Sequence, residues 1–159
     1  MNRNPCIVGV SDFPLKDRGR AGENFTELSI QKYCAIEALN QAGLKMSDVD
    51  GIAVAGMWGM PGPGLMQPNV LVEYLGIKFP KWIEGTNIGG STFLLHINHA
   101  YQAIKAGQCD TVLVLYGSMQ KTNMSRNLGD RPATYSTQFE VVSGLPLPVG
   151  AYAMAAQRH

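Results

Sequence analysis

The stretch 84–92 contains the residues most suited to an anion-binding or catalytic site. An apolar run precedes the pair Gly89-Gly90, and a helical pattern follows it. Backbone N–H groups at the start of a helix attract negative charge, and glycines let a ligand approach the backbone closely. Ser91 and Thr92 add hydroxyl donors. The stretch could bind a phosphate, a carboxylate or a developing oxyanion. The alternative is a tight strand-to-helix turn without a ligand.

A second candidate site lies at the end of the apolar run TVLVLYGS, residues 111–118. Ligands of open α/β sheets favour the carboxyl ends of the strands. Tyr116 and Ser118 are therefore candidates for substrate contact. The alternative is that Tyr116 only packs on a helix.

Two histidines, His96 and His99, are three residues apart on the same expected helix. Zinc sites in proteins need three or four protein ligands, and no third ligand accompanies this pair. We therefore expect histidines that pack or face solvent, and no metal site.

The elements that position these residues alternate along the chain. Short apolar runs bounded by glycine or polar residues predict strands, and apolar residues at helical spacing predict helices. Alternation at this spacing is typical of an α/β layered fold with a mostly parallel sheet and helices on both faces. The expected strands are 6–10, 51–56, 81–85 and 111–118, and the expected helices are 24–42, 67–75, 90–106 and 149–158.

The ends and faces of two helices can be predicted in more detail. Asn24 is the expected N-cap of the first long helix, with Glu27 as its capping-box partner facing away from the core, and Gly43 is its expected stop. The helix that begins at Gly90 is expected to end before Gly107. Its expected apolar face consists of Phe93, Ile97, Ala100, Tyr101 and Ile104.

The chain divides into two expected parts. Residues 1–118 form an α/β core, and residues 119–159 form a loop region followed by the start of another helix. Four strands and a helix without a following strand form an incomplete sheet, so we expect the domain to be truncated at its C-terminal side.

The composition limits the classes of partner. Charged residues make up 16% of the chain, below the usual quarter, which indicates that part of the surface meets another protein. The net charge of +1, without a cluster of Lys and Arg, makes nucleic acid a poor candidate.

Cysteine usage and hydropathy bear on location. The three cysteines, Cys6, Cys34 and Cys109, form no C-x-x-C pair, lie in apolar stretches and are expected to be buried free thiols in a reducing compartment. The N-terminus has no signal-peptide pattern, and no apolar stretch is long enough to span a membrane. We therefore expect a cytoplasmic protein.

Several segments together resemble the thiolase superfamily, in its lipid-transfer-protein or sterol-carrier-protein thiolase branch. CIVGV resembles the first strand of the family, and EALNQAGLKMSDVDGIAVAG resembles its helix, turn and second strand. HAYQAIKAGQCDTVLVLYGS resembles the helix and strand after the catalytic site, and YAMAAQRH resembles the next helix. The resemblance covers nearly all of residues 5–118 and implies the N-terminal half of a thiolase-like layered fold.

The resemblance gives stretch 84–92 a specific meaning. In thiolases the helix after the third strand starts with Asn-x-x-Cys, and the cysteine thiolate takes up the acyl group. Here Asn87, Ile88, Gly89 and Gly90 match that pattern, with Gly90 at the cysteine position. The resemblance implies that Asn87, Gly89 and Ser91 contact substrate and that no covalent acyl transfer passes through Gly90.

Members without the cysteine resemble aldolases that cleave a carbon–carbon bond of steroid side-chain acyl-CoA thioesters together with a partner of OB-like fold. The resemblance therefore implies an acyl-CoA-processing protein of lipid or steroid metabolism, with a coenzyme A thioester as substrate and no covalently bound cofactor. It also implies a homodimer or an OB-fold partner. The remaining catalytic residues of the family lie in a second half, so we do not expect activity from this stretch alone. A non-catalytic acyl-CoA-binding or scaffolding subunit and an acetyl-CoA acyltransferase fragment remain as alternatives.

Overall fold

The computed structural model describes residues 3–15, 25–55, 67–119, 142–144 and 149–159. The chain forms two compact units, residues 1–122 and 123–159.

Three parallel strands form the sheet of the first unit. They are β1 (Gly51–Val54), β2 (Trp82–Glu84) and β3 (Val112–Leu115), in the order β2-β1-β3. Both pairings are parallel, as the alternation of strands and helices predicts. Each strand is shorter than the apolar run that predicted it.

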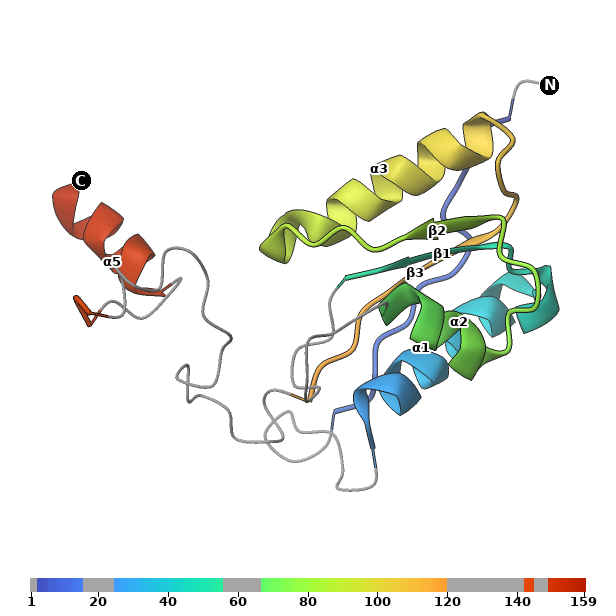
Figure 1. Ribbon diagram of the computed structural model, residues 1–159, viewed down its shortest axis with the longest axis horizontal. Helices are drawn as coiled ribbons and strands as arrows, with labels where there is room; N and C mark the ends of the chain where they lie inside the picture. Colours follow the sequence, from blue (N-terminus) through green and yellow to red (C-terminus); the bar gives the residue numbers. More distant parts are fainter. Residues whose placement is uncertain (1–2, 16–24, 56–66, 120–141, 145–148) are drawn as a thin grey trace. The chain divides into compact units, whose positions relative to one another are not determined.

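Helices cover both faces of this sheet. Figure 1 shows α3 (Thr92–Lys105) on one face and α1 (Glu27–Ala42) with α2 (Gln67–Leu75) on the other. The expected layered α/β class is thus confirmed. The main core cluster lies between the sheet and the helices α1 and α2, and contains Ala35, Leu39, Val49, Ile52, Val54, Leu71, Leu75, Ile77, Leu113 and Leu115.

The ends of α1 partly differ from the prediction. Thr26 is the N-cap, and its side chain accepts the N–H of Ser29 while the Ser29 hydroxyl accepts the N–H of Thr26. The predicted cap, Asn24, lies outside the described residues. Gly43 ends the helix in the left-handed conformation, as predicted.

The predicted orientation of Glu27 is wrong, because this side chain is buried. The reason is tertiary. Gly117, which follows β3, lies so close to the first turn of α1 that a β-carbon on it would stand 2.7 Å from the Glu27 carbonyl oxygen.

The face of α3 that meets the sheet also differs from the prediction. Ile97 and Tyr101 were expected inside but are 41% and 37% exposed. The buried residues of this helix are Thr92, His96, Ala100 and Ala103. These side chains are small or polar, so hydrophobicity alone predicted the wrong face of the helix.

The predicted strand at 6–10 is wrong. The segment is extended but joins no ladder among the described residues (Figure 1, blue), and Ile7 and Val10 are 70% and 69% exposed. It packs on α1 instead: Gly9 lies against the Ala38 carbonyl, and the N–H of Val10 donates to the Gln41 side chain. An apolar run predicts extended backbone, but a ladder also needs a neighbouring strand edge within reach.

Asp50 ties the amino ends of the three strands together. Its Oδ1 accepts the N–H groups of Asp110 and Thr111 at 2.9 and 2.8 Å, and its Oδ2 lies 2.8 Å from Lys81 Nζ. Its carbonyl accepts the N–H groups of Lys81 and Trp82. Asp50, the residue that precedes β1, thus binds the segments that lead into both neighbouring strands.

The second unit contains α5 (Val149–Arg158), at the position where the sequence predicts a helix. In the described part of the chain, no helix has the length and apolar character needed to cross a membrane. The three cysteines are free, as expected, and Cys109 is buried. The expected burial is wrong for Cys34, which is half-buried, and for Cys6, which is exposed because its segment joins no strand of the described sheet.

Candidate functional site

The turn between β2 and α3 carries four of the predicted site residues. A short 3₁₀ turn, Gly89–Ser91, precedes α3, which begins at Thr92 and not at Gly90 as predicted. Asn87 Oδ1 accepts the Gly89 N–H at 3.0 Å. Thr92 Oγ1 accepts the Ile88 N–H at 2.9 Å and donates to the Gly89 carbonyl at 2.6 Å. The turn is thus held by its own side chains.

The two glycines of this turn differ in what they require. Gly89 has a φ of +77°, a conformation that strains any residue with a β-carbon. Gly90 has no positive φ, and a β-carbon there would meet nothing within 4 Å. Glycine is therefore a backbone requirement at 89, whereas position 90 is exposed and has room for a side chain.

This difference predicts opposite effects of one substitution. Gly89→Ala should lower the free energy of unfolding by about 1–2 kcal/mol, because alanine in the left-handed conformation is strained. Gly90→Ala should be neutral or raise it by up to about 1 kcal/mol, because the unfolded chain loses freedom while the fold has room. Urea denaturation of both variants would test this. Equal losses would contradict it.

Tyr116 and Ser118 follow the carboxyl end of β3. The Tyr116 ring packs edge-on against Phe93, with the ring centroids 5.1 Å apart and the planes at 74°. Tyr116 therefore packs on a helix, as the alternative for this residue proposed, and the contact places it beside the first turn of α3. The residue as a whole is 40% exposed. Ser118 is half-buried.

His96 and His99 bond to the segment that leads into the turn. His96 is fully buried, and its Nε2 lies 2.9 Å from the Thr86 carbonyl oxygen. His99 Nδ1 lies 3.0 Å from Glu84 Oε2. Among the described residues no group of three His, Cys, Asp or Glu side chains could hold a metal ion. The sequence predicted histidines that pack or face solvent, but it did not indicate their hydrogen-bond partners.

Glu84 is a second feature that the sequence did not indicate. Its Oε1 accepts both the N–H and the hydroxyl of Thr86. Burial by itself would raise the pKa of this carboxyl, but the hydrogen bonds from Thr86 and His99 outweigh it, and the pKa lies below its ordinary value. Glu84 is therefore a carboxylate at neutral pH. The sequence could not indicate this carboxylate, because its partners Thr86 and His99 are known only from the structure.

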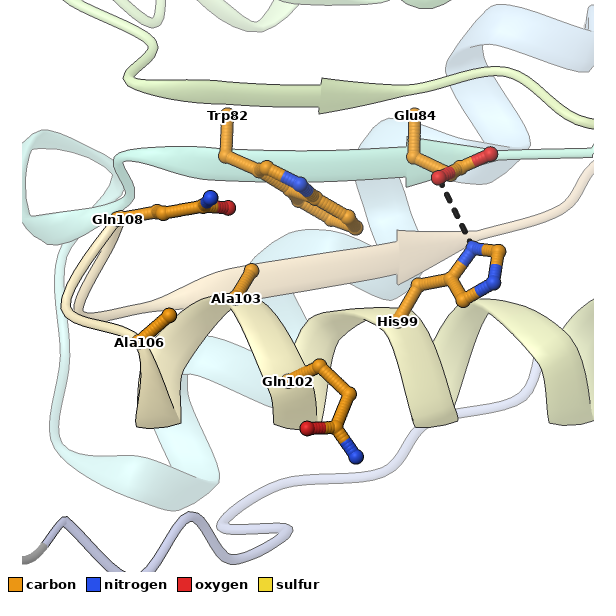
Figure 2. A pocket seen from close by; sticks show the side chains of 7 residues that line it. All are labelled: Trp82, Glu84, His99, Gln102, Ala103, Ala106 and Gln108. Atoms are coloured by element: carbon orange, nitrogen blue, oxygen red, sulfur yellow. Dashed lines mark hydrogen bonds and ion pairs between the residues drawn. The ribbon is translucent and has the colours of Figure 1, made fainter.

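A pocket of about 370 Å³ lies beside this carboxylate, between β2 and the C-terminal half of α3. Figure 2 shows the Trp82 ring and the Glu84–His99 pair on its walls. Gln102 and Gln108 add amide groups to the lining. Ala103 and Ala106 also line the pocket, and their short side chains leave its volume unfilled. None of the predicted site residues lines this pocket, so the turn and the pocket are separate features.

Sequence comparisons leave the family of the chain open. No protein-family profile matches it. A curated relative is the tRNA N6-adenosine threonylcarbamoyltransferase of Paracoccus denitrificans (strain Pd 1222), with 29% identity over 132 residues. That match covers 79% of this chain and 36% of the relative.

Solved structures share the fold. The Ltp2-ChsH2(DUF35) aldolase has a TM-score of 0.67 at 21% identity, covering 86% of this chain and 33% of its own. For 3-oxoacyl-(acyl-carrier-protein) synthase III from Aquifex aeolicus VF5 the TM-score is 0.55 at 24% identity, with coverage of 68% and 34%. Xanthomonas campestris OleA bound with cerulenin has a TM-score of 0.60 at 13% identity, with coverage of 79% and 38%. The fold is thiolase-like, and the chain spans about a third of the length of these proteins.

Proposed function

We propose that the chain belongs to an acyl-CoA-processing protein of lipid or steroid metabolism that works without the thiolase nucleophile, as lipid-transfer-type aldolases do. The substrate would be a coenzyme A thioester, bound with its carbonyl at the turn between β2 and α3. The fold that the chain shares with condensing enzymes and with an aldolase supports this proposal.

The observation that carries the proposal is the open position at Gly90. It lies just before α3, where backbone N–H groups favour negative charge. Space is available for a side chain, yet the residue brings none. Cys109, which lies beyond the opposite end of α3, is buried and has a raised pKa because of burial, so its thiol is a poor nucleophile. Such a turn could stabilise an enolate oxygen, which carbon–carbon cleavage requires.

Titration of the isotope-labelled chain with acetyl-CoA and with a branched acyl-CoA would test the proposal. We expect amide shifts at Ile88 to Thr92, no acyl adduct by mass spectrometry, and weaker binding of both ligands by Gly90→Leu, whose side chain occupies the open space. Asn98→Leu adds the same side chain at an exposed position of α3 and should bind normally. An acyl adduct on the unmodified chain, or no shifts at the turn, would refute the proposal.

A binding or scaffolding subunit is the second candidate. The same absence of a nucleophile at Gly90 favours it, because a turn that binds a thioester needs no reacting group. Thioester binding without carbon–carbon cleavage, measured in a protein that carries the second half of the fold, would favour the subunit. Cleavage products would favour the aldolase.

Exposed apolar side chains support a protein partner, either a second copy or a chain of OB-like fold. β2 is an edge strand of the described sheet, and Ile83 on it is 43% exposed. On α3, Leu94, Ile97 and Tyr101 follow one another at helical spacing, with Leu94 74% exposed. We further propose a cytoplasmic location, in keeping with the free cysteines.

A further inference from the structure

The two histidines of α3 are connected to the residues immediately before the turn. His96 reaches the carbonyl of Thr86, and His99 reaches the carboxylate of Glu84. Glu84 in turn accepts two hydrogen bonds from Thr86. Thr86 is therefore held at its carbonyl, its N–H and its hydroxyl, directly before the residues Asn87 to Gly90.

The hydrogen-bond partners define the proton positions on both rings. A carbonyl oxygen only accepts, so His96 Nε2 carries a proton. His96 Nδ1 is buried and has no hydrogen-bond partner among the described residues. The Glu84 carboxylate also only accepts, so His99 Nδ1 carries a proton. The two histidines thus place their bonding protons on opposite nitrogens.

A buried imidazole with one unpartnered nitrogen lowers stability compared with an apolar side chain of similar size. Packing against the sheet therefore does not account for a histidine at this position. Its one hydrogen bond does something an apolar residue cannot do: it holds the Thr86 carbonyl, which belongs to an exposed residue that water would otherwise solvate.

We propose that His96 is a positioning residue for the turn. It holds Thr86 in place from inside α3, so that the turn from Asn87 to Gly90 keeps its shape, with the Ile88 and Gly89 N–H groups bonded within the turn and Gly90 open to a ligand. His99 does the same through Glu84. This inference rests on the proposed function, because the ligand is the coenzyme A thioester proposed there.

His96→Leu tests the proposal, because leucine fills space and has no donor. We expect an unchanged or higher free energy of unfolding. Amide hydrogen exchange at Ile88 and Gly89 should rise about five- to tenfold, the equivalent of one hydrogen bond, and acetyl-CoA should bind more weakly by a similar factor. His96→Gln keeps an N–H donor on the same helix face and should restore part of both effects.

Ala103→Gly is the matched control on the buried face of α3. It should lower the free energy of unfolding without selectively raising exchange at the turn. Unchanged exchange in His96→Leu, or a rise that only follows a loss of global stability, would overturn the positioning role.

The imidazole nitrogen shifts of the unmodified chain give an independent readout. We expect a proton on Nε2 of His96, and an Nε2 without a proton would overturn the proposal. If the unmodified chain binds no acetyl-CoA, the proposed function fails, whereas the exchange and nitrogen-shift measurements still decide whether His96 holds the turn.

Discussion

Replacing Asp50 with alanine is expected to lower the free energy of unfolding by about 3 kcal/mol, because two backbone N–H groups lose a charged acceptor. Those N–H groups, on Asp110 and Thr111, lie at the entrance to β3, and Lys81 precedes β2. The Asp50 side chain thus contacts the entrances to both strands that flank β1. Guanidinium denaturation, read as a shift of the midpoint at constant slope, would measure the loss.

Asp110→Ala is the matched control. Asp110 also pairs with Lys81, and with Arg3, but its side chain is 57% exposed, so these ion pairs are screened by water. We expect a much smaller loss from this variant. Equal losses from the two variants would show that the charge near Lys81 matters and that the hydrogen bonds to the backbone do not.

The pH dependence of stability gives a second measure of the same residue. Burial alone would raise the pKa of Asp50, but the hydrogen bond from Lys81 and those from the N–H groups of Thr111 and Asp110 hold it below its ordinary value of 3.8. A lowered pKa contributes stability that is complete above the unfolded value and is lost as pH falls through the folded value. Below about pH 4 the unmodified chain should therefore lose stability more steeply than Asp50→Ala.

Gly117→Ala is expected to lower the free energy of unfolding by about 2–3 kcal/mol, because the added carbon has no room. It would stand 2.6 Å from Gln31 Cγ and 2.7 Å from the Glu27 carbonyl oxygen. The second contact is with backbone, which cannot turn aside as a side chain can. The segment after β3 would have to move away from α1, and the Tyr116 ring that precedes Gly117 would move with it.

Gly90→Ala makes the same chemical change where nothing lies within 4 Å, and should cost no stability. Thermal unfolding of the two variants beside the unmodified chain would separate the clash from the general effect of removing a glycine. The close packing of Gly117 on α1 would be disproved by a Gly117→Ala variant as stable as the Gly90→Ala variant.

Features that depend on neighbours along the chain could be predicted from the sequence. Gly43 and Gly76 adopt positive φ at the ends of α1 and α2, where the apolar periodicity stops. The apolar runs that contain β1 and β3 form parallel strands. This was predictable because helices lie between them in the chain, and a strand that follows such a crossover runs parallel to the one before it. The Asn87–Gly90 turn was likewise recognisable, since glycines between a strand and a helix are a local signal.

Tertiary structure alone decided the features that depend on distant segments. Residues 6–10 were apolar enough for a strand, yet they pack on α1 outside the described sheet. In the sequence His96 and His99 are a pair of histidines without a third ligand, and their partners Thr86 and Glu84 come within reach only because α3 packs over β2. Gly117 and Asp50 carry no signal of their own, since their roles arise from carbonyl and N–H groups on segments far away in the chain. Local signals can select a helix or a strand, but only the packed sheet decides which backbone groups remain to be satisfied, and by which side chain.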